Sequence, residues 1–338
     1  MTVQNSVSIV FRVNADKELG LGHLSRCRSL MVAFAGVTLC RFAVVTNNLD
    51  LVRKFLSQVD VDLRAVADIG QVRPADIAII DVPGIAYSEE ESLRGLADLI
   101  VVIDDDGPGI PCQNILLRPN LLDLPLPEGM PLNDYWSGRD CIILHPDFRM
   151  LASQHKNRGR KAKELFVCFG GSDPCGLTLK AIPVLKQIMQ GITVQIVLGA
   201  AFVQTQAVID MTRGDARFTV SQNIPDIARR IGQADIALIS GGTLLYEACA
   251  LGTPAVIVSQ NEPQVVEAAI CAAAGAVIDL GDGRTATDEK ILCALRKILN
   301  DDGLRQSMSC KGPETVSPDG VMHIVSKLLL RARKGAVL

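Results

Sequence analysis

The chain has 338 residues, of which 48% are hydrophobic and 21% charged, and its 34 basic and 37 acidic residues give a net charge of −3. This charge balance and an aromatic content of only 4% argue against the basic surfaces and stacking platforms that nucleic-acid binding requires. A chain of this length is expected to form two domains, since domains usually have roughly 100–200 residues.

The ten cysteines are scattered along the chain and form neither a C-x-x-C pair nor a cluster with zinc spacing. Several, such as Cys168 and Cys249, lie in apolar runs, where a thiol behaves as a small hydrophobic group. The segment MTVQNSVSIVF lacks the features of a signal peptide, and no apolar run reaches membrane-spanning length. The sequence therefore predicts a reduced, soluble, cytoplasmic protein.

Short apolar runs rich in β-branched residues predict a series of strands. In chain order these lie at 8–13, 40–45, 76–80, 99–103, 114–117, 165–169, 193–198, 235–240 and 254–258. Segments of helical length lie between several of them, and this alternation is typical of a parallel sheet with helices on both faces.

A polar, basic segment at 153–164 interrupts the series and is interpreted as a linker, while the periodic segment 320–332 predicts a last helix. We therefore predict an α/β protein of two doubly wound, Rossmann-like domains, 1–155 and 156–338, with the last helix in the second domain. Ligands of such sheets bind beyond the carboxyl ends of the strands, and with two domains the default site is the cleft between them.

The first candidate loop is KELGLGHLSRC, which follows the first strand. Gly20 and Gly22 would let backbone N–H groups approach an anion at a helix start. His23, one of only four histidines, is either a capping residue or a general base, because imidazole ordinarily titrates close to neutral pH. Arg26 is either a surface charge or an anion partner one helical turn further on.

The second candidate loop is CFGGSDPCGLT, residues 168–178. Gly170, Gly171 and Ser172 could bind a phosphate at the start of a helix. An equally good structural interpretation makes Ser172 or Asp173 the N-cap of a helix with Pro174 at its first position. The sequence leaves both interpretations open.

The third candidate loop is ISGGTLLYE, residues 239–247. Gly241, Gly242 and Thr243 lie between a strand and a helix, which again suits an anion. Glu247 follows one turn into that helix. It is either a plain helix residue or a carboxylate that accepts hydrogen bonds from the two ribose hydroxyls of a nucleotide.

Asp104, Asp105 and Asp106 could be taken for a metal site, but no histidine follows them, and a solvated loop is the favoured interpretation. The histidines His145 and His323 are interpreted as structural or exposed. No P-loop, nucleophile elbow or H-E-x-x-H motif is present. The sequence predicts no metal and no cofactor.

An ordered set of short motifs gives the chain a resemblance to a known family. These are FRVNADKELGLGHLSRC (11–27), VVIDDD (101–106), ILLRPNL (115–121), IILHPDFRML (142–151), FGGSDPCGLT (169–178), ISGGTLLYEACALGTPAVIV (239–258) and PDG (318–320). In this order they resemble the UDP-2,4-diacetamido-2,4,6-trideoxy-β-L-altropyranose hydrolases of pseudaminic acid biosynthesis and the related spore-coat polysaccharide proteins.

The resemblance implies a GT-B glycosyltransferase fold whose C-terminal half binds UDP. In the family pattern, Glu247 binds the ribose and Gly242-Thr243 lies near the diphosphate. Asn223 and Ile224 lie by the uracil, and the segment NEPQ supplies Asn261 and Gln264. His23 activates water against the anomeric carbon without a metal.

The segment DVPGIAY departs from the family pattern, since Val82 and Pro83 stand where sugar contacts are expected. UDP is therefore better supported than the particular sugar. The predicted function is hydrolysis of a UDP-linked deoxy-amino sugar. The alternatives are a transferase that uses a nucleotide-sugar donor and a non-catalytic sugar-nucleotide binding protein.

Overall fold

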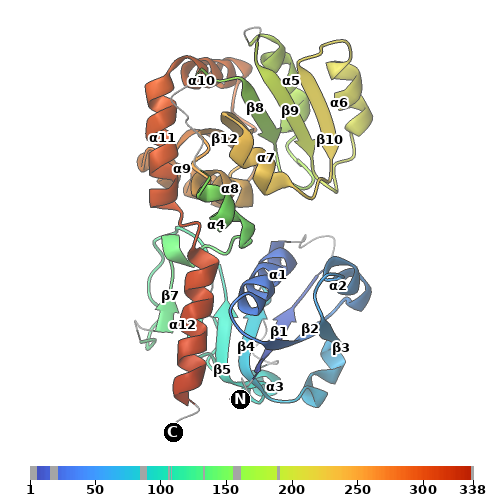
Figure 1. Ribbon diagram of the computed structural model, residues 1–338, viewed down its shortest axis with the longest axis vertical. Coiled ribbons are helices and arrows are strands. Elements are labelled where there is room, and N and C mark those ends of the chain that lie inside the picture. Colours follow the sequence, from blue (N-terminus) through green and yellow to red (C-terminus); the bar gives the residue numbers. More distant parts are fainter. Residues whose placement is uncertain are drawn as a thin grey trace. The chain divides into compact units, whose positions relative to one another are not determined.

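The structure is a computed structural model that describes residues 6–15, 22–83, 90–105, 107, 109–131, 134–154, 161–188 and 191–335. The chain divides into two compact units (Figure 1). The N-terminal unit comprises 1–146 together with 319–338, and the C-terminal unit comprises 147–318. No helix among the described residues is long and apolar enough to cross a membrane.

The N-terminal unit is built on a seven-stranded sheet in the order β3-β2-β1-β4-β5-β6-β7. Its strands are β1 (Val7–Val13), β2 (Cys40–Thr46), β3 (Val61–Ala65), β4 (Ala75–Asp81), β5 (Ala97–Ile103), β6 (Ile115–Leu117) and β7 (Tyr135–Trp136). Every neighbouring pair is parallel. The central strands are buried on both faces, as their continuous apolar sequences predict.

The helices of this unit are α1 (Gly22–Ala35), α2 (Leu49–Phe55), α3 (Glu90–Arg94) and α12 (Gly320–Gly335). The last helix forms as predicted, but it belongs to the N-terminal unit rather than to the second domain. Its residues Val321, Ile324, Val325 and Leu328 are buried in the same apolar cluster as α1 and β1. The predicted boundary at 155 also differs from the observed division after Pro146, because α4 (Asp147–Ala152) packs on helices of the C-terminal unit.

The C-terminal unit has a six-stranded parallel sheet in the order β10-β9-β8-β11-β12-β13. Its strands are β8 (Glu164–Cys168), β9 (Thr193–Leu198), β10 (Phe218–Gln222), β11 (Ile236–Ile239), β12 (Ala255–Ser259) and β13 (Val277–Asp282). Besides α4, its helices are α5 (Leu177–Lys186), α6 (Thr205–Thr212), α7 (Ile227–Gln233), α8 (Thr243–Ala250), α9 (Glu262–Ala273), α10 (Asp288–Asn300) and α11 (Asp302–Thr315).

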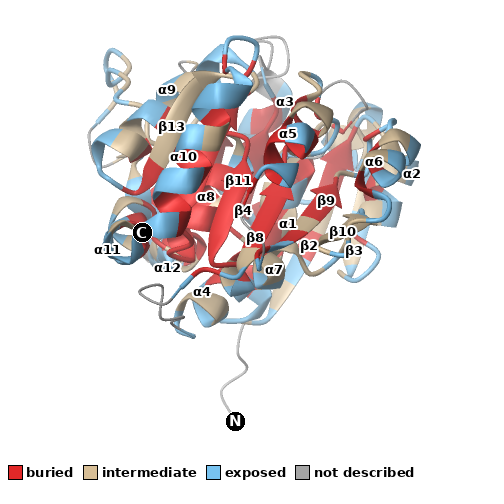
Figure 2. Ribbon diagram, turned by 90° about the horizontal axis from the view of Figure 1, so that it is seen from above, coloured by how far each residue is buried: buried red, intermediate tan, exposed pale blue. Residues whose placement is uncertain are grey.

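Burial follows the same scheme in both units. The strands near the middle of each sheet are buried, whereas helices such as α6, α9 and α10 turn an exposed face outward (Figure 2). In each unit the chain runs from the centre of the sheet to one edge and then returns to build the other half. The predicted fold, two doubly wound Rossmann-like domains, is therefore confirmed.

Candidate functional site

Both sheets reverse their strand order once, between β1 and β4 in the N-terminal unit and between β8 and β11 in the C-terminal unit. The loops at the carboxyl ends of the two strands diverge at such a point and leave room for a ligand. The candidate loops of the sequence follow β1, β8 and β11. Each unit therefore presents its candidate residues at the position where this architecture binds ligands.

In the N-terminal unit, His23 lies in the first turn of α1 and contacts Asp81, the last residue of β4. His23 Nδ1 is 2.7 Å from Asp81 Oδ1. A carboxylate oxygen can only accept, so Nδ1 carries the proton and donates it to Asp81. The other ring nitrogen, Nε2, then holds a lone pair in the neutral ring, and none of the described residues bonds to it. With its side chain 17% exposed, His23 can accept a proton through Nε2.

Arg26 binds the same carboxylate from one turn further along α1. Its Nε donates to Asp81 Oδ2 at 2.6 Å, and its Nη2 donates to Oδ1 at 2.7 Å. Asp81 is fully buried, and burial alone raises the pKa of a carboxyl group. The charge and hydrogen bonds of Arg26, with the hydrogen bond from His23, outweigh this and hold the pKa of Asp81 below its ordinary value. Asp81 is therefore a carboxylate.

The loop after β5 places Asp105 on the far side of Arg26. Arg26 Nη1 donates to both Asp105 oxygens, at 2.8 and 3.1 Å, and Asn120 Nδ2 donates to the Asp105 carbonyl at 2.6 Å. The neighbouring Asp104 accepts the backbone N–H groups of Gly107 and Gly109. These carboxylates thus hold an arginine and a turn, and no metal-binding group is found among the described residues.

Three further residues of this region complete the N-terminal predictions. Gly22 is the first residue of α1, and a Cβ added there would meet nothing within 4 Å, so space does not require glycine at this position. Gly20 and Asp106 lie outside the described residues.

In the C-terminal unit, the loop after β8 differs from its prediction. The helix α5 begins at Leu177 behind an N-cap at Gly176, not at Pro174. The reason lies in the backbone, because Gly170, Asp173 and Gly176 all have positive φ and interrupt a helix. The exposed Gly171 and Ser172 lie in this turn.

Asp173 nevertheless serves the start of α5. Its two carboxylate oxygens accept the N–H groups of Leu177 and Thr178, at 2.9 and 2.7 Å. These amides are therefore already bonded within the chain. The structural interpretation of this loop thus accounts for the N-terminus of α5 without a ligand.

The helix α8 differs from α5 at its N-terminus. It begins at Thr243 behind Gly242, and no side chain caps its N-terminus, so its first amides are open to an anion. One turn further on, the Glu247 Oε2 atom is fully buried and has no hydrogen-bond partner in the described part of the chain. Burial raises the pKa of this carboxyl group to about 8. A buried acceptor without a donor is costly for the protein and suits a ligand that supplies hydroxyl groups.

The loop after β12 lies against the start of α8. A Cβ on Gly241 would come within 2.7 Å of Ser259 Oγ, so only glycine fits there. Gln264 lies beside Gly242, with its Nε2 atom 3.3 Å from the position of an added Cβ. Asn261 is the N-cap of α9 and accepts the Gln264 N–H at 3.1 Å. Asn261 therefore has a structural role. Gln264 Oε1 also accepts the Gln260 N–H, at 2.9 Å, while its Nε2 lies toward the α8 loop.

Asn223 and Ile224 follow β10, at the same carboxyl edge of the sheet. Asn223 is exposed and has a left-handed backbone with φ of 51°, and its N–H donates to the Leu198 carbonyl. Asparagine tolerates this conformation better than most residues. Ile224 is half-buried.

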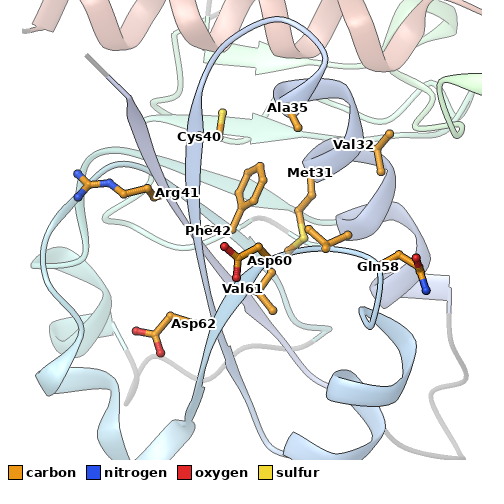
Figure 3. Close-up of a pocket in the computed structure, with 11 residues that line it drawn as sticks. Met31, Val32, Ala35, Cys40, Arg41, Phe42, Gln58, Asp60, Val61 and Asp62 are labelled. Atoms are coloured by element: carbon orange, nitrogen blue, oxygen red, sulfur yellow. The ribbon is translucent and has the colours of Figure 1, made fainter. Parts of the chain in front are cut away.

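A separate cavity of about 590 Å³ lies at the opposite, amino edge of the N-terminal sheet (Figure 3). Met31, Phe42 and Val61 contribute apolar walls, and Arg41 and Asp62 carry charges at its border. The cavity is formed where α1 ends and β2 and β3 begin, so it contains none of the residues that were predicted to bind a ligand.

Sequence reasoning missed the partners that organise these sites. Asp81 was visible as a charged residue directly after an apolar strand, but only the pairing of β1 with β4, which brings Val13 opposite Asp81, places it beside His23. Gln260 was missed altogether. Its Nε2 donates to the Phe169 carbonyl at 2.6 Å, which ties the loop after β12 to the loop after β8.

Comparison with curated proteins gives two relatives, and no family model matches the chain. The spore coat polysaccharide biosynthesis protein SpsG of Bacillus subtilis is 29% identical over 195 residues, 57% of each chain. The uncharacterized protein MJ1062 of Methanocaldococcus jannaschii is 22% identical over 275 residues, 76% of this chain and 57% of the relative. The chain thus spans little more than half the length of these relatives.

Solved structures match nearly the whole chain at low identity. MurG of Acinetobacter baumannii has a TM-score of 0.66 at 15% identity and covers 96% of this chain and 99% of its own. MnaA of S. aureus, solved with UDP, has a TM-score of 0.62 at 13% identity, with 96% and 97% covered. The UDP-GlcNAc 2-epimerase of Methanocaldococcus jannaschii has a TM-score of 0.59 at 11% identity, with 96% and 99% covered. The protein therefore has the fold of two parallel-sheet, Rossmann-like domains that GT-B glycosyltransferases and UDP-sugar epimerases share.

Proposed function

We propose that this protein is a sugar-nucleotide enzyme of polysaccharide biosynthesis that hydrolyses a UDP-linked deoxy-amino sugar and releases UDP. The observation that carries the proposal is the pair formed by His23 and Asp81, in which the buried carboxylate holds Nδ1 and no described residue bonds to Nε2. This is the arrangement of an oriented general base. The name of the SpsG relative and the UDP-binding neighbours agree with this class of substrate.

In the proposed reaction His23 Nε2 takes a proton from water, and the water oxygen forms a bond to the anomeric carbon. The bond from that carbon to the diphosphate oxygen breaks, and its electron pair leaves with UDP. The open N-terminus of α8 would stabilise the negative charge that develops on the diphosphate. No step requires a metal.

Glu247 supports the choice of a nucleotide as the leaving group. Its unpaired Oε2 lies one turn behind the N-terminus of α8. A diphosphate at that N-terminus would bring the ribose hydroxyls toward the carboxyl group, and each hydroxyl can donate the hydrogen bond that Oε2 lacks.

Phosphorus NMR of the purified protein with a panel of UDP-sugars tests the proposal. We expect UDP to be released without an acceptor, and the release to survive EDTA. Release only after an acceptor is added would instead identify a transferase. Binding of UDP without turnover of any sugar would identify a binding protein, and either result would contradict hydrolysis.

We expect Glu247→Gln to weaken UDP binding and to stabilise the ligand-free protein. Glutamine offers one acceptor oxygen instead of two, and a buried ribose hydroxyl left without its acceptor costs about 1–3 kcal/mol, roughly 5- to 150-fold in affinity. In the wild type, burial raises the pKa from 4.5 to about 8, so the folded chain holds a proton that the unfolded chain releases. Between pH 4.5 and about 8 the free energy of unfolding of the wild type therefore falls as the pH rises, by up to about 1.4 kcal/mol per pH unit. Glu247→Gln removes this loss.

Calorimetry with UDP and thermal unfolding between pH 5 and 8 measure the two effects of Glu247→Gln. The exposed Glu314 of α11 provides the control, since Glu314→Gln should change neither. An unchanged UDP affinity in folded Glu247→Gln protein would remove Glu247 from the nucleotide site.

A further inference from the structure

The cavity at the amino edge of the N-terminal sheet lies beside an exposed apolar turn. This turn, residues 36–39, connects the end of α1 to the start of β2, so it joins Ala35 and Cys40, which both line the cavity (Figure 3). Its side chains Val37 and Leu39 are 47% and 61% exposed. One face of this unit therefore carries an apolar projection directly beside an apolar hollow.

We propose that this face, which comprises the cavity and the turn 36–39, binds a second copy of this chain in a two-fold symmetric interface. In such an interface both copies use the same surface, so each feature must meet a complementary feature of that surface. The apolar turn of each copy enters the cavity of the other. The inference goes beyond the proposed function and does not depend on it.

The charges that line the cavity show the same complementarity. Arg41 of β2 and Asp60, just before β3, are both exposed, and neither has a hydrogen bond or an ion pair with a described residue. Figure 3 shows the Arg41 side chain extending away from Asp60. The other lining carboxylate, Asp62, is already bound by Arg64 Nε and Nη2, at 3.1 and 3.0 Å. A two-fold axis pairs Arg41 of each copy with Asp60 of the other.

The apolar turn is held in place before any partner binds. The N–H groups of Val37 and Thr38 donate to the Phe34 carbonyl, at 3.0 and 3.1 Å, and the Val7 N–H donates to the Leu39 carbonyl at 2.9 Å. Little conformational entropy is then lost when the turn is buried. Burial also removes from water an apolar patch that soluble monomers rarely expose.

The charge pattern favours a second copy over a lipid surface. Segments that lie on anionic membranes surround their apolar residues with several basic ones, whereas this cavity offers one unpaired charge of each sign among the described residues. Equal and opposite charges beside a projection and a hollow are what a self-complementary surface requires. The candidate loops after β1 and β4 lie at the opposite edge of the sheet, so this interface leaves them open.

Sedimentation velocity of the full chain tests the proposal. We expect the wild type to form a dimer at concentrations up to roughly 100 µM, far above a micromolar Kd. Leu39→Asp should weaken the dimer by at least about 100-fold, because a central apolar anchor typically contributes about 30-fold and symmetry applies the change twice. The matched control is Val203→Asp, which changes an exposed apolar residue of the C-terminal unit and should leave the dimer intact.

Reversal of the two charges tests the pairing across the axis. Arg41→Asp and Asp60→Arg should each weaken self-association by about tenfold or more, because like charges then meet at both contacts. Mixed in equal amounts, the two variants should form a heterodimer in which both pairs are opposite in charge. Native mass spectrometry, with an affinity tag on one variant, distinguishes this heterodimer from either homodimer.

A wild type that stays monomeric, or a dimer that Leu39→Asp leaves intact, would overturn the proposal. Failure of the two charge variants to associate when mixed would contradict the two-fold pairing. Sedimentation of a monomeric wild type with anionic phospholipid vesicles, lost in Leu39→Asp, would assign the surface to a membrane instead. None of these measurements involves turnover of a UDP-sugar, so their outcome is separate from that of the proposed function.

Discussion

Replacing His23 with asparagine should lower the turnover of the UDP-sugar by roughly 10²–10⁴-fold, the usual contribution of a general base. UDP affinity should be unchanged, because the proposed contacts to the diphosphate and the ribose come from the C-terminal unit. The acid limb of the rate profile should also disappear, because asparagine cannot act as a base. Steady-state rates of UDP release across the pH range measure both effects.

The control for this variant is His323→Asn, since His323 lies exposed on α12 of the same unit. It should keep the wild-type rate and pH profile. A folded His23→Asn protein that keeps the acid limb and most of its activity would show that His23 is structural and that the base is another residue.

Replacing Asp81 with asparagine should destabilise the N-terminal unit by about 3–5 kcal/mol, the cost of breaking a buried ion pair. The amide cannot neutralise Arg26, which would be left with the half-exposed Asp105 as its only carboxylate partner among the described residues. The chain has one tryptophan, and Trp136 lies buried in β7 of this unit. Urea unfolding followed by tryptophan fluorescence therefore reports on the affected unit alone.

The pH dependence of the same variant has a definite sign. The pKa of Asp81 is held below its ordinary value of 3.8, so its contribution to stability is present above that value and is lost as the pH falls through the folded-state pKa. The stability difference between wild type and Asp81→Asn should therefore shrink in acid. Asp76→Asn, at the exposed start of the same strand, is the control. Equal stability of the two variants would contradict an ion pair at Asp81.

The strands that could be predicted are the ones with a continuous apolar sequence. Those nearest the centre of each sheet, such as β1, β4 and β8, are buried on both faces, and their composition alone identifies them. The strands β3, β10 and β13 were missed because they lie at the sheet edges, where half-buried positions carry polar residues. The two-residue β7 is too short to give a pattern.

The site could be predicted only in part, because some of its residues lie in a recognisable local sequence pattern, whereas others reach the site only through the pairing of distant strands. His23 and Glu247 occur beside glycines at strand-to-helix junctions, which local sequence reveals. Asp81 and Asp105 act through contacts with residues 55 and 79 positions away in the chain. Nothing in a single sequence gives the pairing of β1 with β4 and of β4 with β5 that brings these carboxylates to Arg26.

The return of α12 to the N-terminal unit has a consequence for synthesis. Translation produces the sheet of this unit first, but the helix that covers part of its core is produced after the whole C-terminal unit. While the ribosome makes residues 147–318, the apolar surface that later receives Ile324 and Leu328 has no cover from its own chain. The unit that is made first is therefore completed last, and protease resistance of its sheet on arrested nascent chains should rise only after residue 328 has emerged.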